Sequence, residues 1–320
     1  MRARGFLLAV AALLGLLPPP AAEAQSYPVR PVRLVVPFPP GGSLDIAGRL
    51  LAEPLQRRWG QPVVVENKPG GTSGVDAVVR SAPDGYTLLI ISSSPLLTLH
   101  HLQRVSYDPL RDLAPVARTT LLTYTLVVNP AMEIRSVAEL IARARAAPGK
   151  IDYASAGNGS GQHLYMELLK AAAAIALTHV PYKGAAPALQ AVLAGDVPLM
   201  MDVAIATEPA VKAGKLRAIL VTGDRALPQF PAAEPFDRLF PGYGIPTWHG
   251  VFAPAGTPRE LVDSLARDIA DALSEPAVRT RFAEMGVVTA PLSGPAFQTM
   301  VRRDDARWGE IISRNGLRAD

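Results

Sequence analysis

Two glycine-rich segments carry the residue types best suited to binding a small anion. The first glycine corner, residues 37–45, places Gly41, Gly42 and Ser43 after a β-branched run and before an amphipathic segment. The second glycine corner, residues 155–161, reads Ser-Ala-Gly-Asn-Gly-Ser-Gly in the same setting. Each predicts a strand that turns into a helix, and the unpaired backbone N–H groups of a helix N-terminus attract negative charge. Two such corners predict two lobes that face one ligand.

Helix N-termini alone are too weak to account for tight binding. Each stabilises an anion by ~0.3–1 kcal/mol, or up to ~2 kcal/mol when partly buried. Micromolar affinity needs ~8 kcal/mol. Hydrogen bonds to a charged acceptor, at ~1.5–3 kcal/mol each, must supply much of the rest. We therefore expect the two lobes to close on the ligand and exclude water.

Three further side chains lie near strand ends and are ambiguous. Asp45 would repel an anion, so we expect it mainly to complement the helix dipole and support its loop. A water-mediated or amine contact is the alternative for this carboxylate. Asp202, near the end of the predicted strand 197–203, either caps the next loop or accepts a hydrogen bond from a ligand hydroxyl or amine. Tyr182 is either part of a structural turn or a lining residue.

Other chemistries lack the residues they require. No serine lies in a G-x-S-x-G elbow, so we predict no catalytic residue. Gln162 replaces the last glycine of G-x-G-x-x-G, and no phosphate-loop lysine follows, which disfavours a nucleotide or other cofactor. The five histidines show no i,i+4 pair and cysteine is absent, so we expect no metal site. An exported hydrolase is the alternative from another class.

The N-terminal residues predict export. Arg2 and Arg4 precede an apolar stretch at 6–17 and a small-x-small site at 22–24, which is the pattern of a signal peptide cleaved after Ala24. No later apolar run is long enough to cross a bilayer. Without cysteine there is neither a disulfide nor a lipid-modified cysteine. We therefore expect a freely diffusing periplasmic protein without a lipid anchor, and a monomer.

The charge balance argues against nucleic acid as a partner. The chain has 32 basic and 28 acidic residues, a formal net charge of +4. The basic residues are scattered and do not alternate with aromatic ones, unlike those of nucleic-acid-binding surfaces. Weak positive charge favours small acids slightly.

Strands alternate with helices along the mature chain, which predicts an α/β fold with mainly parallel sheets. Ligands of such sheets bind beyond the carboxyl ends of the strands. We expect the chain to cross between lobes near 124–130 and to return near 246–252, which makes a two-segment hinge. The predicted division is a signal peptide at 1–24, a first lobe at 25–124 and 248–320, and a second lobe at 125–247.

Six motifs follow one another in order across nearly all of residues 27–260. They are Pro39-x-Gly41-Gly42-x-x-Asp45, Val65-Glu66-Asn67-x-Pro69-Gly70, Ala82-Pro83-Asp84-Gly85-Tyr86-Thr87-Leu88, Ser155-Ala156-Gly157-x-Gly159-Ser160 before His163-Leu164, His179-Val180-Pro181-Tyr182-Lys183-Gly184, and Trp248-x-Gly250-x-x-Ala253-Pro254-Ala255-Gly256-Thr257-Pro258. This series resembles the Bug family, the periplasmic solute-binding proteins of tripartite tricarboxylate transporters.

The resemblance implies a two-lobed periplasmic binding protein of the Venus-flytrap, type II-like class. It also implies a small carboxylate ligand held largely by backbone groups and waters, and delivery to the two permease subunits of the transporter. With the ambiguous Tyr182 included, the expected ligand-binding residues are Gly41, Gly42, Ser43, Asp45, Ser92, Ser93, Ser155, Ala156, Gly157, Asn158, Ser160, Tyr182 and Asp202.

Two departures from the family pattern touch the expected pocket. Pro40 stands where a small residue is usual, and Ser94-Pro95-Leu96 replaces a more polar sequence after Ser93. Both leave the identity of the ligand open. The partner is open too, because a sensor kinase in place of a permease fits the same residues.

Overall fold

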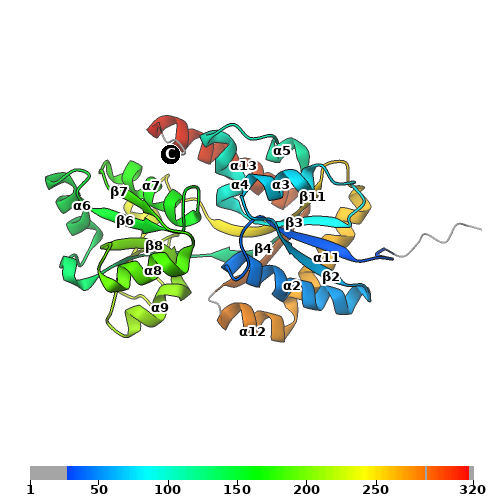
Figure 1. Ribbon diagram of the computed structural model, residues 1–320, viewed down its shortest axis with the longest axis horizontal. Coiled ribbons are helices and arrows are strands. Elements are labelled where there is room, and N and C mark those ends of the chain that lie inside the picture. Colours follow the sequence, from blue (N-terminus) through cyan, green and yellow to red (C-terminus); the bar gives the residue numbers. More distant parts are fainter. Residues whose placement is uncertain (1–26, 285–286, 317–320) are drawn as a thin grey trace, which may run out of the picture.

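The computed structural model describes residues 27–284 and 287–316, so the predicted signal peptide lies outside the described residues. The described chain forms two six-stranded sheets, each with helices on both faces (Figure 1). No helix in these two ranges is long and apolar enough to cross a membrane.

The first sheet has the strand order β12-β4-β11-β3-β1-β2. Its strands come from two separate parts of the chain, an N-terminal part and a C-terminal part. They are β1 (Val32–Val36), β2 (Val63–Asn67), β3 (Thr87–Ser92), β4 (Leu113–Leu122), β11 (Thr247–Pro254) and β12 (Val288–Ser293).

The second sheet has the order β10-β9-β5-β8-β6-β7, built from the middle of the chain. Its strands are β5 (Tyr124–Val128), β6 (Asp152–Ser155), β7 (Thr178–Pro181), β8 (Leu199–Val203), β9 (Arg217–Val221) and β10 (Glu234–Pro235). The two orders correspond strand for strand, with β1 equivalent to β6, β3 to β8 and β11 to β5. The five strands other than β12 and β10 also correspond in direction, because β12 runs against β4 whereas β10 runs with β9.

Most strands in each sheet run in one direction. In the first sheet β1, β2, β3 and β4 are co-directional, and β11 and β12 oppose them. In the second sheet only β5 opposes the other described strands. This arrangement confirms the predicted α/β fold with mainly parallel strands.

Helices alternate with most of the strands along the chain. They are α2 (Ser43–Trp59), α3 (Thr72–Val79), α4 (Ser93–Leu102), α5 (Pro109–Asp112), α6 (Val137–Ala146), α7 (Gly161–Ala173), α8 (Ala185–Ala194), α9 (Ala204–Lys212), α10 (Phe236–Leu239), α11 (Arg259–Ser274), α12 (Pro276–Glu284) and α13 (Gly294–Asn315), with one 3-10 turn at Pro130–Met132. Local signals explain several ends. Ser136 Oγ accepts a hydrogen bond from Glu139 N at the start of α6, and Gly60 ends α2 with φ of 62°.

The chain crosses between the two sheets twice. Only Thr123 separates β4 from β5, and the chain returns when β11 begins at Thr247. β5 and β11, which each run against both of their neighbouring strands, thus each begin at a crossing. In Figure 1 both crossings lie in the middle of the molecule.

Two strands of the first sheet, β4 and β12, lie in segments for which the sequence predicts no strand. The run that forms β4 contains Pro115 and Arg118, which break its strand pattern. In the structure Arg118 donates a hydrogen bond to Ala290 O of β12 at 2.7 Å, so this polar residue joins the two unpredicted strands.

The apolar core differs on the two faces of the sheets. One cluster of buried residues runs through both lobes, whereas two separate clusters cover the opposite face of each sheet. Aromatic rings join the shared cluster, with Tyr124 stacked on Tyr165 at 5.0 Å and Tyr165 edge-on to Trp308 at 6.4 Å. Trp248 is fully buried there, and its Nε1 donates to Asp304 Oδ2 at 2.9 Å. Its role is core packing.

Candidate ligand-binding site

The predicted site residues lie where strands end and helices begin. Gly42 is the N-cap of α2 after β1, and Ser160 is the N-cap of α7 after β6. Because β1 and β6 are equivalent strands, the two glycine corners occupy equivalent positions in the two sheets. Ser92 and Asp202, at the ends of β3 and β8, form a second equivalent pair.

The first glycine corner leaves its backbone open. Gly41, Gly42 and Ser43 are all exposed. Gly41 has φ of +84°, a left-handed conformation that glycine adopts without strain. A Cβ built on Gly42 would meet only Pro39 O, at 3.8 Å. The N-terminus of α2 is therefore accessible to a ligand.

Asp45 holds this corner in place. Its carboxylate accepts hydrogen bonds from Gly41 N at 2.9 Å and from Asn67 Nδ2 at 3.0 Å, and it forms an ion pair with Arg49 at 3.0 Å. Burial alone would raise the pKa of Asp45, but the hydrogen bonds from Arg49, Gly41 and Asn67 hold that pKa below its ordinary value. The geometry gives this buried carboxylate a supporting role.

The second glycine corner is organised around Ser155. Its hydroxyl lies 2.6 Å from His179 Nε2 and accepts a hydrogen bond from Gly157 N at 3.0 Å. Ser160 Oγ accepts from His163 N at 3.3 Å and so caps α7. Tyr182 N donates to Ser155 O at 3.0 Å, which places Tyr182 beside the corner. Ala156 is half-buried and Asn158 is exposed at its tip.

The residues after β3 form the beginning of α4. Ser92 is the N-cap of α4, but its side chain makes no capping hydrogen bond. Ser93 is buried, and its Oγ accepts a hydrogen bond from Trp248 N at 3.2 Å. Ser93 therefore fastens α4 to β11. The neighbouring Ser94 Oγ is buried and has no hydrogen-bond partner in the described part of the chain.

Asp202 is a buried carboxylate that is only partly satisfied. Its Oδ1 accepts hydrogen bonds from Gln162 Nε2 at 3.1 Å and Val203 N at 2.8 Å. Its Oδ2 is buried and has no partner among the described residues. Burial raises the pKa of Asp202 to about 6, although these two hydrogen bonds oppose the shift. A ligand hydroxyl or amine would supply the missing donor.

Helix α4 of the first lobe packs against the second glycine corner. A Cβ built on Gly159 would lie 3.0 Å from Leu99 Cδ2, and one on Gly71 would lie 3.9 Å from Leu99 Cδ1. Leu99 thus packs on the second corner although it belongs to the first lobe. No sequence motif points to Leu99, or to Gln162 as the partner of Asp202, because each acquires its position through contacts between segments distant in the sequence.

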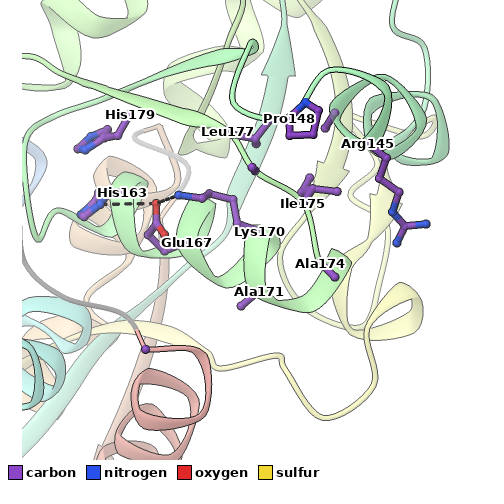
Figure 2. A pocket seen from close by; sticks show the side chains of 13 residues that line it. Arg145, Pro148, His163, Glu167, Lys170, Ala171, Ala174, Ile175, Leu177 and His179 are labelled. Carbon is purple, nitrogen blue, oxygen red and sulfur yellow. Dashed lines mark hydrogen bonds and ion pairs between the residues drawn. The ribbon is translucent and has the colours of Figure 1, made fainter.

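A large cavity lies behind α7 and is distinct from the predicted site. It has a volume of about 980 Å³, and none of the predicted site residues lines it. Figure 2 shows Glu167 between His163 and Lys170 on its wall. Glu167 Oε1 also accepts a hydrogen bond from Tyr153 OH at 2.6 Å. Tyr153, His163 and Lys170 thus share one carboxylate on the wall of this cavity.

Comparison with known proteins agrees with this geometry. The family described as "Tripartite tricarboxylate transporter family receptor" matches residues 47–317. Protein BugT of Bordetella pertussis is 36% identical over 301 residues, covering 92% of each chain. An R. palustris protein solved with adipate has a TM-score of 0.81 and 33% identity, covering 91% of this chain and 99% of its own.

A second solved structure, MatC from Rhodopseudomonas palustris with bound malate, has a TM-score of 0.79 and 30% identity. It covers 89% of this chain and 100% of its own. The family match and these relatives extend over both sheets. This chain therefore belongs to the tripartite tricarboxylate transporter receptor family, which includes the Bug proteins.

Proposed function

We propose that this protein is a periplasmic receptor that binds a small carboxylate between its two lobes and delivers it to the permease subunits of a tripartite tricarboxylate transporter. One observation carries the proposal. The two glycine corners occupy equivalent strand ends, and each begins a helix of at least 13 residues. Each corner thus offers backbone N–H groups and a helix dipole to an anion.

The supporting side chains fit the same function. Asp45 fixes the first corner from behind, so the loop presents N–H groups without its own carboxylate facing the ligand. Ser155, Gly157, Ser160 and Tyr182 form the second corner. Adipate and malate, bound in the two related structures, are both dicarboxylates. A dicarboxylate or hydroxy-dicarboxylate is the ligand class we propose.

The remaining parts of the proposal concern the whole chain. Residues 25–124 with 248–320 form the first lobe, residues 125–247 form the second, and the hinge lies at the two crossings. The protein is exported, is cleaved after Ala24, carries no lipid anchor and acts as a monomer. It holds its ligand without altering it.

Titration calorimetry on mature protein, residues 25–320, tests the function. The panel contains malate, succinate, adipate, citrate, aspartate and an aromatic monocarboxylate. We expect micromolar or tighter binding of at least one acid, and a loss of at least tenfold in affinity for Gly42→Val. The open surroundings of Gly42 mean that the fold accepts this change.

Ala255→Val is the matched control. Ala255 is exposed and follows the C-terminal end of β11. Because β11 runs against β3, this end of the strand lies at the edge of the first sheet opposite to the glycine corners. Affinity equal to that of the wild type is expected for this control. Absence of binding to every acid contradicts the receptor function, whereas unchanged binding in Gly42→Val contradicts the placement of the site.

A further inference from the structure

Two adjacent histidines and a distant aspartate converge at one point of the first lobe. His100 and His101 lie in the last turn of α4, and Asp305 lies in α13. His100 Nε2 is 2.9 Å from Asp305 Oδ1, and His101 Nε2 is 3.3 Å from the same oxygen. One ligand atom from each residue lies within 4.8 Å of the other two.

The packing of α13 against α4 builds this arrangement. A Cβ on Gly309 would lie 2.8 Å from His101 Cε1 and 3.2 Å from His101 Nε2. Any larger residue at Gly309 would displace the His101 ring from Asp305. The carboxylate itself is buried, with the residue only 7% exposed. Asp305 is therefore set in the helix interface, with His100 half-buried and His101 exposed at its edge.

The local charges favour a cation. In the described ranges no lysine or arginine forms an ion pair with Asp305, which faces only the two imidazoles. The cluster also lies at the C-terminal end of α4, where the helix dipole is negative. His100 Nδ1 is buried without a hydrogen-bond partner among the described residues, so this nitrogen can carry the ring proton when Nε2 binds an ion in place of its contact with Asp305.

We propose that His100, His101 and Asp305 bind one divalent transition-metal ion, for which Zn²⁺ is the best match. Zn²⁺ accepts imidazole nitrogen and carboxylate oxygen at about 2.0–2.2 Å, which places tetrahedral ligand atoms about 3.3 Å apart. The observed separations of 2.9 and 3.3 Å are close to that spacing. Small rotations of the three side chains complete the site.

Open space beside the cluster provides the remaining ligands. A cavity of about 590 Å³ is lined by His100, His101 and the chain that follows them, as far as Asp108. Water from this cavity fills the coordination positions that the protein leaves open. Because His100 lacks a partner at Nδ1 that would orient its ring, we expect an exchangeable ion rather than a permanently held one.

The ion would connect α4, which begins at the candidate ligand-binding site, with the C-terminal helix α13. Ser92 and Ser93, at the other end of α4, belong to the candidate ligand-binding site. That end is about 11–14 Å away along the helix, because about seven to nine helical residues separate the two pairs and each rises about 1.5 Å. The metal site is thus separate from the carboxylate site and does not depend on the proposed function.

Titration of chelator-treated, tag-free residues 25–320 with Zn²⁺, followed by calorimetry, tests the site. We expect one ion per chain, and Co²⁺ in its place should give visible d–d absorption of a low-symmetry N/O site. His101→Gln and Asp305→Asn should each weaken Zn²⁺ binding at least tenfold. Gly309→Ala keeps all three ligand groups and should also weaken it by displacing the His101 ring.

Glu310→Gln is the matched control, because Glu310 is an exposed carboxylate of the same helix that pairs only with Arg314 in the described structure. It should bind Zn²⁺ as the wild type does. Circular dichroism shows whether each variant is folded. If Asp305→Asn is unfolded, the test rests on His101→Gln and Gly309→Ala. Absence of Zn²⁺ binding to the wild type, or equal binding by these variants, overturns the proposal. No carboxylate is present in the titration, so its outcome is independent of the receptor function.

Discussion

Replacement of Asp202 by asparagine should change the pH dependence of stability in a direction fixed by the structure. Burial raises the pKa of Asp202 from 3.8 to about 6 in the folded protein. Between pH 3.8 and pH 6 the folded state therefore keeps a proton on Asp202 that the unfolded state has released. The stability associated with this group is fully present below pH 3.8 and is lost as pH rises through 6. A shift of about 2 units corresponds to about 3 kcal/mol.

His249 contributes the opposite slope over nearly the same range. Complete burial lowers the pKa of His249 from 6.5 to about 4, and its Nδ1 has no partner among the described residues. The unfolded state binds the proton first, so this stability is present above pH 6.5 and is lost as pH falls toward 4. In the wild type the two slopes nearly cancel.

Urea unfolding at half-unit steps from pH 4 to 7.5 measures the effect. The free energy of unfolding of Asp202→Asn, minus that of the wild type, should rise by about 2.4 kcal/mol between pH 4 and pH 7, because part of the change lies below pH 4. Any destabilisation by the asparagine amide that does not depend on pH shifts the whole curve of the free-energy difference against pH without changing its slope. His249→Gln is the control of opposite sign, since its difference from the wild type should rise as pH falls. A flat difference for Asp202→Asn would refute the assignment of a buried, half-satisfied carboxylate.

Three further changes probe the corner supports and the core. Gly161→Ala would place a Cβ against the Tyr124 ring and hydroxyl, so urea unfolding should show a loss of about 1–3 kcal/mol. Asp45→Ala removes the acceptor of several hydrogen bonds at the first corner, and we expect a similar loss of about 1–3 kcal/mol together with weaker carboxylate binding in calorimetry. Asp304→Ala leaves the buried Trp248 Nε1 without its acceptor and should cost about 1–3 kcal/mol in urea unfolding, with ligand affinity retained.

The sequence predicted those features that depend on neighbouring residues. A β-branched run followed by Gly41-Gly42 or by residues 155–161 specifies a strand, a tight turn and a helix within one short segment. The alternation of such units was enough to predict two α/β lobes. The supporting role of Asp45 also followed from its place in the first turn of α2, and its bonds to Gly41 and Asn67 agree with that role.

The features that were missed depend on contacts between distant segments. From sequence the strand 86–93 ends in Ser92-Ser93-Ser94 and the next segment has no clear pattern, yet α4 begins at Ser93, which accepts a hydrogen bond from Trp248, 155 residues away. Asp305 and His101 are 204 residues apart, so no spacing rule connects them. The strand β4 contains polar and proline residues that local propensity assigns elsewhere, and pairing with β11 on one side and β12 on the other outweighs that preference.

The apolar cluster shared by both lobes also determines the direction from which a ligand enters. Separating the lobes on that side would expose buried side chains, and exposing about 200 Å² of apolar surface costs about 5 kcal/mol. On the opposite face each lobe has its own apolar cluster. Separating the lobes on that face exposes neither cluster to water. If the proposed hinge lies at Thr123 and at the start of β11, we therefore expect the molecule to open on one side only. We expect solvent and ligand to be exchanged through that side, while the aromatic contacts of Tyr124, Tyr165 and Trp308 stay buried.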